Sequence, residues 1–592
     1  MKSFSIQSKN NLLIINYLPQ LLIIGLILLV YIQNLWFDFA YLDDNLIVFI
    51  EYDKINSLLK IPGTFIGGYL FDNYYRPMVM ISFIIDTAIA GQSSFMYHLT
   101  NMLLHISVCL LFYMLLSKLT TSKIFPLLLT LLFCVHPLNV NAVSWIVGRN
   151  DLIVAFFSLL SFLWFIKYME EEKLFSLVLT MLFYLFAMYS KEIGILIPFI
   201  SAAYVILIRT DKKKKINLAL IIISYLIPFL IYVASRVLFS PVKVSEEISF
   251  NALLQNLNIP FEYLAKTFYF FEFNPLPMEN FTLIVLGLLL VGTLILIFLF
   301  NKRINKRLFL FGVLFFLVFV IPTLFVRIKA EDLDFNYIDC RAYLPFIGIL
   351  IIFLSIMETF NKDIIKSLFG KIITIIILLY ASATTVIENQ YYENGGTFWG
   401  RATEIYPDRA TYWIGLGTYY FNKQDFNKAV QFGEKAIKIN PQIPEYYYKT
   451  ASAYVKEKDF NSAIELLQKV IVIEPDKSPA LLNLIKLYLQ IGDTINAEKS
   501  TTELISIASN KNEAKYLASA SYYYFDIANV KYAINLMSLA IRIDPKNSRY
   551  KNDLGAMYYK IEDITSAKKY FLEALQIEPK NPKYRSNLDL CK

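Results

Sequence analysis

Charged side chains are scarce in this chain of 592 residues: they make up 18% of the sequence, against 56% for hydrophobic ones. An ordinary soluble protein has about a quarter charged residues, so the composition argues against a soluble multidomain enzyme and also against disorder. The long apolar runs are confined to residues 1–387, and no run from residue 388 onward could span a bilayer. The sequence therefore predicts a membrane domain over 1–387 and a water-soluble domain over 388–592.

Cysteine and net charge are also low. The four cysteines include no Cys-x-x-Cys pair, and two of them lie inside apolar runs, which excludes a disulfide framework and a zinc site. A net charge of +8 is small for this length and gives no indication of nucleic-acid binding. The apolar part shows none of the internal symmetry that secondary transporters have, which argues against a transporter.

About eleven apolar segments are interpreted as membrane-spanning helices, several of them short. The first lacks the small-residue cleavage site of a signal peptide, so we interpret it as an anchor. The predicted segments are 18–36, 98–116, 124–136, 151–168, 174–189, 193–208, 216–238, 281–300, 308–327, 344–360 and 372–387.

Basic residues concentrate in alternate loops between these segments. The positive-inside rule assigns such loops to the cytoplasm and therefore predicts a cytoplasmic N-terminus. The long loops 37–97 and 239–280, and everything after residue 387, then lie on the opposite face. That face is the periplasm if the membrane is a bacterial inner membrane, or the lumen in a eukaryote. The basic loops contain Lys118 and Lys123, Lys167 and Lys173, Arg209 and Lys212–Lys215, Lys302–Arg307, and Lys362–Lys371.

A 34-residue period runs through the C-terminal part. Prolines recur at this interval at Pro407, Pro441 and Pro475, and again at Pro545 and Pro579. Small residues keep the same register, so that two helices of one unit can approach closely, and the proline ends the second helix. This is the tetratricopeptide pattern of helix–turn–helix units. The matching alanines are Ala429, Ala463, Ala497, Ala533 and Ala567.

We count about five repeats, with a half-repeat around Trp399 and Ala402 and a small insertion between Pro475 and Pro545. Such repeats stack into a solenoid whose concave surface suits extended peptides. We therefore predict that this domain binds a protein partner. A structural spacer or a dimerisation arm is the alternative.

Ionisable residues near membrane depth are candidates for function. Asp43 and Asp44 follow the first span by a few residues. Two adjacent carboxylates there could accept a proton from a hydroxyl or hold a divalent cation, and the plainer alternative is a solvated turn. Other polar residues gather at the external ends of the predicted spans. They are Arg76, Asp86, His98, His136, Arg149, Asp151, Lys191, Glu192, Asp339, Arg341 and Tyr343, with His105 deeper in its helix.

A guanidinium group matches the oxygens of a phosphate with two parallel hydrogen bonds. Arg76, Arg149 and Arg341 are therefore candidates for contact with a phosphate, although each could instead pair with a carboxylate. His98 and His136 are not at metal-ligand spacing. His105, inside an apolar helix, is more simply a hydrogen-bonded residue of the core.

The order of these motifs resembles the transmembrane and tetratricopeptide-repeat O-mannosyltransferases and their bacterial relatives, in the GT-C glycosyltransferase superfamily. The motifs are the Asp pair, Tyr-Arg-Pro at 75–77, the histidine motif at 97–105, His-Pro through Gly-Arg-x-Asp at 136–151, Ser-Lys-Glu at 190–192 and Arg-x-Tyr-Leu-Pro at 341–345. The resemblance implies an all-α protein, with a polytopic GT-C-like domain followed by the solenoid.

The resemblance also implies an activity. A mannose-like hexose would pass, with inversion, from a polyprenyl-phosphate carrier to Ser or Thr hydroxyls of exported proteins that the repeats bind. Asp43 or Asp44 would be the base. The donor phosphate would contact Arg76, Arg149, Arg341 and Tyr343. Supporting roles would fall to His98, His136, Asp151, Lys191 and Glu192.

Two departures from the family pattern stand out. Asn139 and Asn141 occupy positions where the family usually has His and Glu, and Cys340 replaces the Glu before Arg341. The acid partner of Arg341 must then be Asp339 or be absent. Two other functions stay open: transfer of the sugar to an envelope glycan or lipid, and a non-catalytic membrane scaffold.

The alternation of basic loops predicts the orientation of the chain. A reporter enzyme that works only outside the cytoplasm should be active when fused after about residue 390 and silent when fused near Lys213. Activity at Lys213 with silence after residue 390 would reverse the orientation, and with it the side of the membrane on which the polar residues lie.

Overall fold

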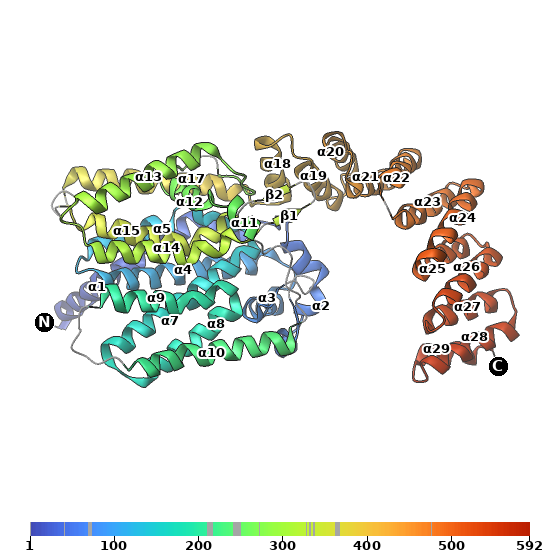
Figure 1. Cartoon of the computed structure of the whole chain (residues 1–592), viewed down its shortest axis with the longest axis horizontal. Helices are drawn as coiled ribbons and strands as arrows, with labels where there is room; N and C mark the ends of the chain where they lie inside the picture. Colours follow the sequence, from blue (N-terminus) through green and yellow to red (C-terminus); the bar gives the residue numbers. More distant parts are fainter. Residues whose placement is uncertain are drawn as a thin grey trace. The chain divides into compact units, whose positions relative to one another are not determined.

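The computed structural model describes residues 2–40, 42–68, 74–209, 217–240, 250–270, 273–326, 328–330, 333–335, 338–360, 367–474 and 476–591. The chain divides into two units, Met1–Pro407 and Asp408–Lys592 (Figure 1). The basic run Lys212–Lys215 and Pro475 lie outside the described residues.

The first unit continues past residue 387, where the apolar runs end, because it includes helix α18 (Gly395–Ile405). Arg401 of α18 acts electrostatically on Glu388, near the end of the preceding helix. Glu393 accepts a 2.8 Å backbone hydrogen bond from Asp38 in the first external loop. The predicted half-repeat around Trp399 therefore belongs to the first unit.

The first unit is built almost wholly from helices, which run side by side in Figure 1. Within the described residues, the departure from the predicted all-α fold is an antiparallel pair, β1 (Ile328–Ala330) and β2 (Leu333–Phe335), with Ile328 opposite Phe335. The helices are α1 (Lys2–Tyr31), α2 (Tyr52–Ile55), α3 (Pro77–Ala90), α4 (Ser94–Leu119), α5 (Ile124–Cys134), α6 (Val140–Ser144), α7 (Arg149–Glu171), α8 (Leu174–Ser190), α9 (Ile197–Ala203), α10 (Leu218–Phe239), α11 (Phe250–Gln255), α12 (Ile259–Lys266), α13 (Phe281–Phe300), α14 (Lys306–Leu324), α15 (Tyr343–Met357), α17 (Leu368–Gln390) and α18.

Eight of the helices in the described residues are long and apolar enough to cross a membrane. All eleven predicted segments overlap helices, but 174–189 and 193–208 are shorter apolar helices, and 124–136 is half of a pair bent by 54°. The bend falls before Pro137, which cannot continue the hydrogen bonding of α5. The first unit is thus a multi-pass membrane domain, and its number of spans stays a prediction.

Helices α4 and α7 run in the same direction, as the alternation of spans requires. Their N-terminal ends meet where Arg149 donates a 2.8 Å hydrogen bond to the carbonyl of Tyr97. Their C-terminal ends meet at an ion pair of 2.8 Å between Lys118 and Glu170. The polar motifs and the basic loops therefore lie at opposite ends of this helix pair.

Helices α14 and α15 pack closely through glycine. A Cβ atom at Gly312 would lie 2.7 Å from the backbone nitrogen of Ile352, and one at Gly348 would collide with the backbone of Phe316. Small residues permit this close approach between membrane helices. The contact fixes α15, whose N-terminus follows the turn that contains Arg341.

The second unit confirms the predicted repeat. Five helix pairs follow one another, and a final helix, α29 (Pro582–Asp589), closes the array. The predicted insertion lies in α24, which has 18 residues where the corresponding helix α22 has 14. The pairs are α19 (Ala410–Asn422) with α20 (Phe426–Ile439), α21 (Pro444–Glu457) with α22 (Phe460–Ile473), α23 (Ser478–Gln490) with α24 (Thr494–Lys511), α25 (Ala514–Asp526) with α26 (Val530–Ile543), and α27 (Ser548–Lys560) with α28 (Ile564–Ile577).

The second helix of each repeat begins at the same kind of cap. In the second repeat, Asp459 accepts a 3.1 Å hydrogen bond from the backbone of Ser462, and Lys458 just before it has a left-handed φ of 66°. A short side chain that accepts from the first turn is the usual way to begin a helix. The corresponding caps are Asp425, Asp493, Asn529 and Asp563.

Candidate active site

Charged residues from distant parts of the sequence meet at one end of the membrane domain. We call this set the polar belt and define it as Arg76, Asp151, Lys191, Glu192, Arg236, Lys266, Asp339 and Arg341. Its members come from the N-terminal ends of α3, α7 and α15 and the C-terminal ends of α8, α10 and α12. Helix α3 and strands β1 and β2 lie at the same end of the helix bundle in Figure 1.

Two ion-pair groups form one side of the belt. The ammonium of Lys191 lies 2.6 Å from Asp151. The next residue, Glu192, accepts a 2.9 Å hydrogen bond from Arg76 and lies 3.8 Å from Arg236. These contacts join α3, α7 and α10 to the turn after α8. Arg236, near the end of the apolar helix α10, was not among the predicted site residues. The one feature of the sequence that could have identified it is a charged residue inside the predicted span 216–238.

The other side of the belt surrounds the turn Asp339–Ala342. Lys266 donates to both oxygens of Asp339, at 2.7 and 2.9 Å, and both side chains are almost fully buried. From the sequence, the acid partner of Arg341 was expected to be Asp339 or to be absent. In the structure, Asp339 pairs with Lys266 instead. Lys266, at the end of α12, was not among the predicted site residues.

Arg341 is partly buried, and its Nη1 atom is enclosed without a hydrogen-bond partner among the described residues. An unsatisfied buried donor costs about 1–3 kcal/mol, so such atoms in native proteins call for an explanation. Arg341, Lys191 and Asp151 are all electrostatic neighbours of the Cys340 thiol, so Arg341 lies in the same part of the site as the Lys191–Asp151 pair. The arrangement suits an anion that completes the guanidinium.

Asn141 holds the backbone beside Arg341. Its side chain accepts a 3.1 Å hydrogen bond from the backbone of Cys340 and donates one of 2.7 Å to the hydroxyl of Tyr392. Asn139 instead donates to the carbonyl of Phe133. Asn141, noted in the sequence only as a departure from the family pattern, thus ties the turn of Arg341 to the segment after α17.

Arg149 has a different role from the other arginines. It is fully buried and forms an ion pair of 2.7 Å with Asp86 of α3. It also donates to the side chain of Asn101 and the carbonyl of Tyr97 in α4. These contacts bind α3, α4 and α7 together, and we therefore reassign Arg149 from the donor phosphate to the scaffold.

Tyr343 is also displaced from its predicted role. It is fully buried, and its hydroxyl lies 2.6 Å from Nδ1 of His105. Nε2 of His105 faces the carbonyl of Cys134 at 3.1 Å and so donates to it, which leaves Nδ1 to accept from Tyr343. Tyr343 therefore faces the helix core, and we withdraw it as a phosphate contact.

The two remaining histidines hold turns. Nδ1 of His136 accepts from the backbone of Leu138, and Nε2 donates to the carbonyl of Thr267 at 3.1 Å. His98 faces the carbonyl of Asp38 at 3.5 Å. Both are buried, and their contacts fasten the loop and the helix ends around the belt.

The two aspartates of the first external loop differ sharply. Asp44 is buried and accepts backbone hydrogen bonds from Ala40 at 2.6 Å and Leu42 at 3.1 Å. Asp43 is half-buried, and its carboxylate makes no hydrogen bond among the described residues. Burial raises the pKa of both carboxyl groups to about 6. Asp44 thus closes the turn of the loop, and Asp43 is the carboxylate available to a ligand.

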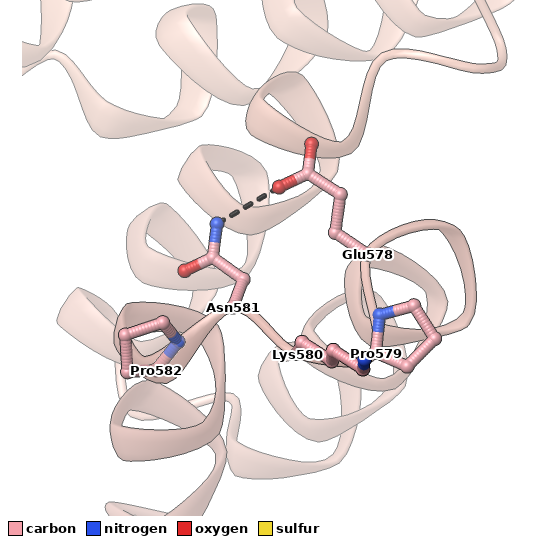
Figure 2. Close-up of a pocket in the computed structure, with 5 residues that line it drawn as sticks. All are labelled: Glu578, Pro579, Lys580, Asn581 and Pro582. Carbon is pink, nitrogen blue, oxygen red and sulfur yellow. Dashed lines mark hydrogen bonds between the residues drawn. The ribbon is translucent and has the colours of Figure 1, made fainter.

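A divalent cation does not fit the aspartate pair. Both oxygens of Asp44 face backbone N–H groups, which repel a cation. In the part of the chain that the structure describes, no three His, Cys, Asp or Glu side chains converge as metal ligands. A hollow elsewhere, at the turn Glu578–Pro582 of the second unit, contains none of the predicted site residues, and two of the residues that line it are joined by a 2.9 Å hydrogen bond from Asn581 to Glu578 (Figure 2).

Comparison with known proteins identifies the repeats and suggests the family. Models of the tetratricopeptide repeat match residues 410–443, 444–477 and 548–581. Protein O-mannosyl-transferase tmtc2 of Xenopus laevis is 35% identical over 164 residues, which are 26% of this chain and 19% of that protein. Protein O-mannosyl-transferase Tmtc1 of Drosophila melanogaster is 33% identical over 121 residues, or 20% and 14%.

The chain thus matches about a fifth or less of the length of these relatives. They carry the name of the family that the motifs resemble. Among solved structures, YrrB, described as a TPR protein with an unusual peptide-binding site, is 15% identical. It covers 32% of this chain and 96% of its own, with a TM-score of 0.24.

The different roles of Asp43 and Asp44 can be tested by measuring the stability of variants at each position. Asp44→Asn should lower the free energy of unfolding by about 1–3 kcal/mol, because one amide oxygen cannot accept the bonds that two carboxylate oxygens accept. Asp43→Asn, the matched control, should unfold at the wild-type temperature or above it. Thermal unfolding of both variants in detergent measures this, and equal losses in the two would contradict the assignment of the turn to Asp44.

Proposed function

We propose that this protein is a glycosyltransferase that moves a mannose-like hexose from a polyprenyl-phosphate carrier to Ser or Thr hydroxyls of proteins outside the cytoplasm. The observation that carries the proposal is the enclosed Nη1 atom of Arg341, which has no hydrogen-bond partner among the described residues and lies at one end of the membrane domain. Relatives named as protein O-mannosyl-transferases support the reaction class. The polyprenyl donor and the side of the membrane are our inferences from the motifs and the basic loops.

The belt has the charge that a lipid phosphate requires. Its five cationic and three anionic side chains leave a net positive charge of two. Most of the cations are already paired, so they set the field of the site, and Arg341 makes the direct contact. In a medium of low dielectric constant, such preorganised charge stabilises a leaving phosphate far more than it would in water.

In the proposed reaction, the hydroxyl oxygen of the acceptor attacks the anomeric carbon of the hexose. The bond from that carbon to the phosphate oxygen breaks on the opposite side, which inverts the anomeric centre. Asp43 takes the hydroxyl proton, and the polyprenyl phosphate leaves with its charge held by Arg341. A carboxyl group with a pKa of about 6 is well matched to this task near neutral pH.

The repeats would supply the protein acceptor. Solenoid repeats expose a long surface suited to an extended peptide, and an unfolded segment is where Ser and Thr hydroxyls are accessible. We propose accordingly that the membrane domain is catalytic and that the repeats lie outside the cytoplasm. An acceptor that is a glycan or lipid would leave the repeats without a role in the reaction.

Mass spectrometry of exported proteins tests the proposal. Cells with the gene should yield Ser- and Thr-containing peptides that carry an added hexose, and cells without it should not. Complementation with Arg341→Met should fail, and Lys118→Met, which alters an ion pair at the other end of α4, should succeed. Unchanged protein glycosylation in cells without the gene would refute a protein acceptor, and a hexose lost from an envelope glycan instead would establish the alternative.

The assignment of the base predicts a pH profile. Since Asp43 must be deprotonated to act, kcat/KM should fall as the pH drops below about 6, the pKa to which burial raises this carboxyl group. Asp43→Asn should lower the rate by about two to four orders of magnitude and leave donor binding intact. Transfer assays with purified protein between pH 5 and 8 measure both. A rate in Asp43→Asn within threefold of wild type would exclude Asp43 as the base.

A further inference from the structure

Opposite charges stand two residues apart in the turn that precedes α15. Asp339 and Arg341 are both at the edge of the belt, but they do not pair with each other. Asp339 accepts hydrogen bonds from Lys266 at both carboxylate oxygens, and the buried Nη1 of Arg341 has no hydrogen-bond partner among the described residues.

Lys266 cannot itself reach a ligand. Its side chain is 3% exposed, and its ammonium lies 5.5 Å from the ring centre of Phe273. The charges around the pair come from several elements. Glu388 of α17 is an electrostatic neighbour of both Lys266 and Asp339, and Arg401 of α18 acts on Glu388 in turn.

Asp339 and Arg341 share Tyr263 as an electrostatic neighbour. The charges of both act on the hydroxyl of Tyr263, one turn before Lys266 in α12. This hydroxyl donates a 3.0 Å hydrogen bond to the carbonyl of Ile338, at the start of the same turn. Arg341 lies in the same turn as Asp339, so a carboxylate released from Lys266 could turn to this guanidinium, with which it would form a strong two-pronged pair.

We infer that Lys266 is a positioning residue that occupies Asp339 and so keeps Arg341 available for the phosphate of a polyprenyl phosphate. The inference rests on the proposed function and adds a specific residue to it. Asp339 in this view is a competitor of the substrate phosphate for one guanidinium. Lys266 removes that competition from a position that the lipid never touches.

Binding of undecaprenyl phosphate to the purified full-length protein in detergent tests the inference. Lys266→Met should weaken binding by about 10- to 100-fold, the effect of losing one charged hydrogen-bond partner. The double variant Lys266→Met/Asp339→Asn should return to within about threefold of wild type, because the competing charge is gone. In an Arg341→Met background, Lys266→Met should have no further effect, since the two residues act through the same group.

Two controls separate positioning from mere support of the fold. Asp339→Asn alone should bind undecaprenyl phosphate more tightly than wild type, because the carboxylate that competes with the phosphate is gone, whereas a structural role for the pair predicts a loss. This variant also carries the test should Lys266→Met not fold. Lys118→Met, which breaks an ion pair at the other end of α4, should have no effect.

The outcomes distinguish this inference from the proposed function. Full affinity in Lys266→Met, or a double variant as weak as the single one, would overturn the inference and leave the function standing. A wild-type protein that binds no undecaprenyl phosphate would overturn both.

Discussion

The need to pair buried charges is the constraint on which the membrane domain depends. A charged group enclosed by apolar helices is tolerated when an opposite charge and further hydrogen bonds satisfy it. Arg149 meets this need completely, through Asp86, Asn101 and Tyr97. Because these partners come from α3, α4 and α7, satisfying one guanidinium also fixes the mutual arrangement of three helices.

Where most charges are paired, the exceptions become informative. Among the described residues, the buried Nη1 of Arg341 has no hydrogen-bond partner, and the carboxylate of Asp43 in the first external loop makes no hydrogen bond. One is a cation suited to phosphate and the other a carboxylate with a raised pKa. The proposed transfer reaction uses these two groups, and the inference about Lys266 explains how the first is kept from its nearest competitor.

The second unit is stabilised differently, because its contacts are mainly between elements that are close in the sequence. Each repeat contacts mainly its neighbours, and each second helix begins at an Asp or Asn cap of the same design. An insertion could therefore enter the third repeat and lengthen α24 without disturbing the register of the repeats that follow. An array of this kind can change its partner without altering the membrane domain.

The sequence alone determined the features that depend on short stretches of chain. Apolar length marked the helices of the membrane domain, and the 34-residue period marked the repeats, since both arise from contacts between residues near each other along the chain. The same reasoning identified Asp43, Asp44, Arg149 and Arg341 as candidates. Only the tertiary structure decided their roles. Which guanidinium is paired depends on residues more than fifty positions apart, such as Arg149 and Asp86, and so does the pairing of Lys266 with Asp339. No local pattern records which distant charge will fold against which.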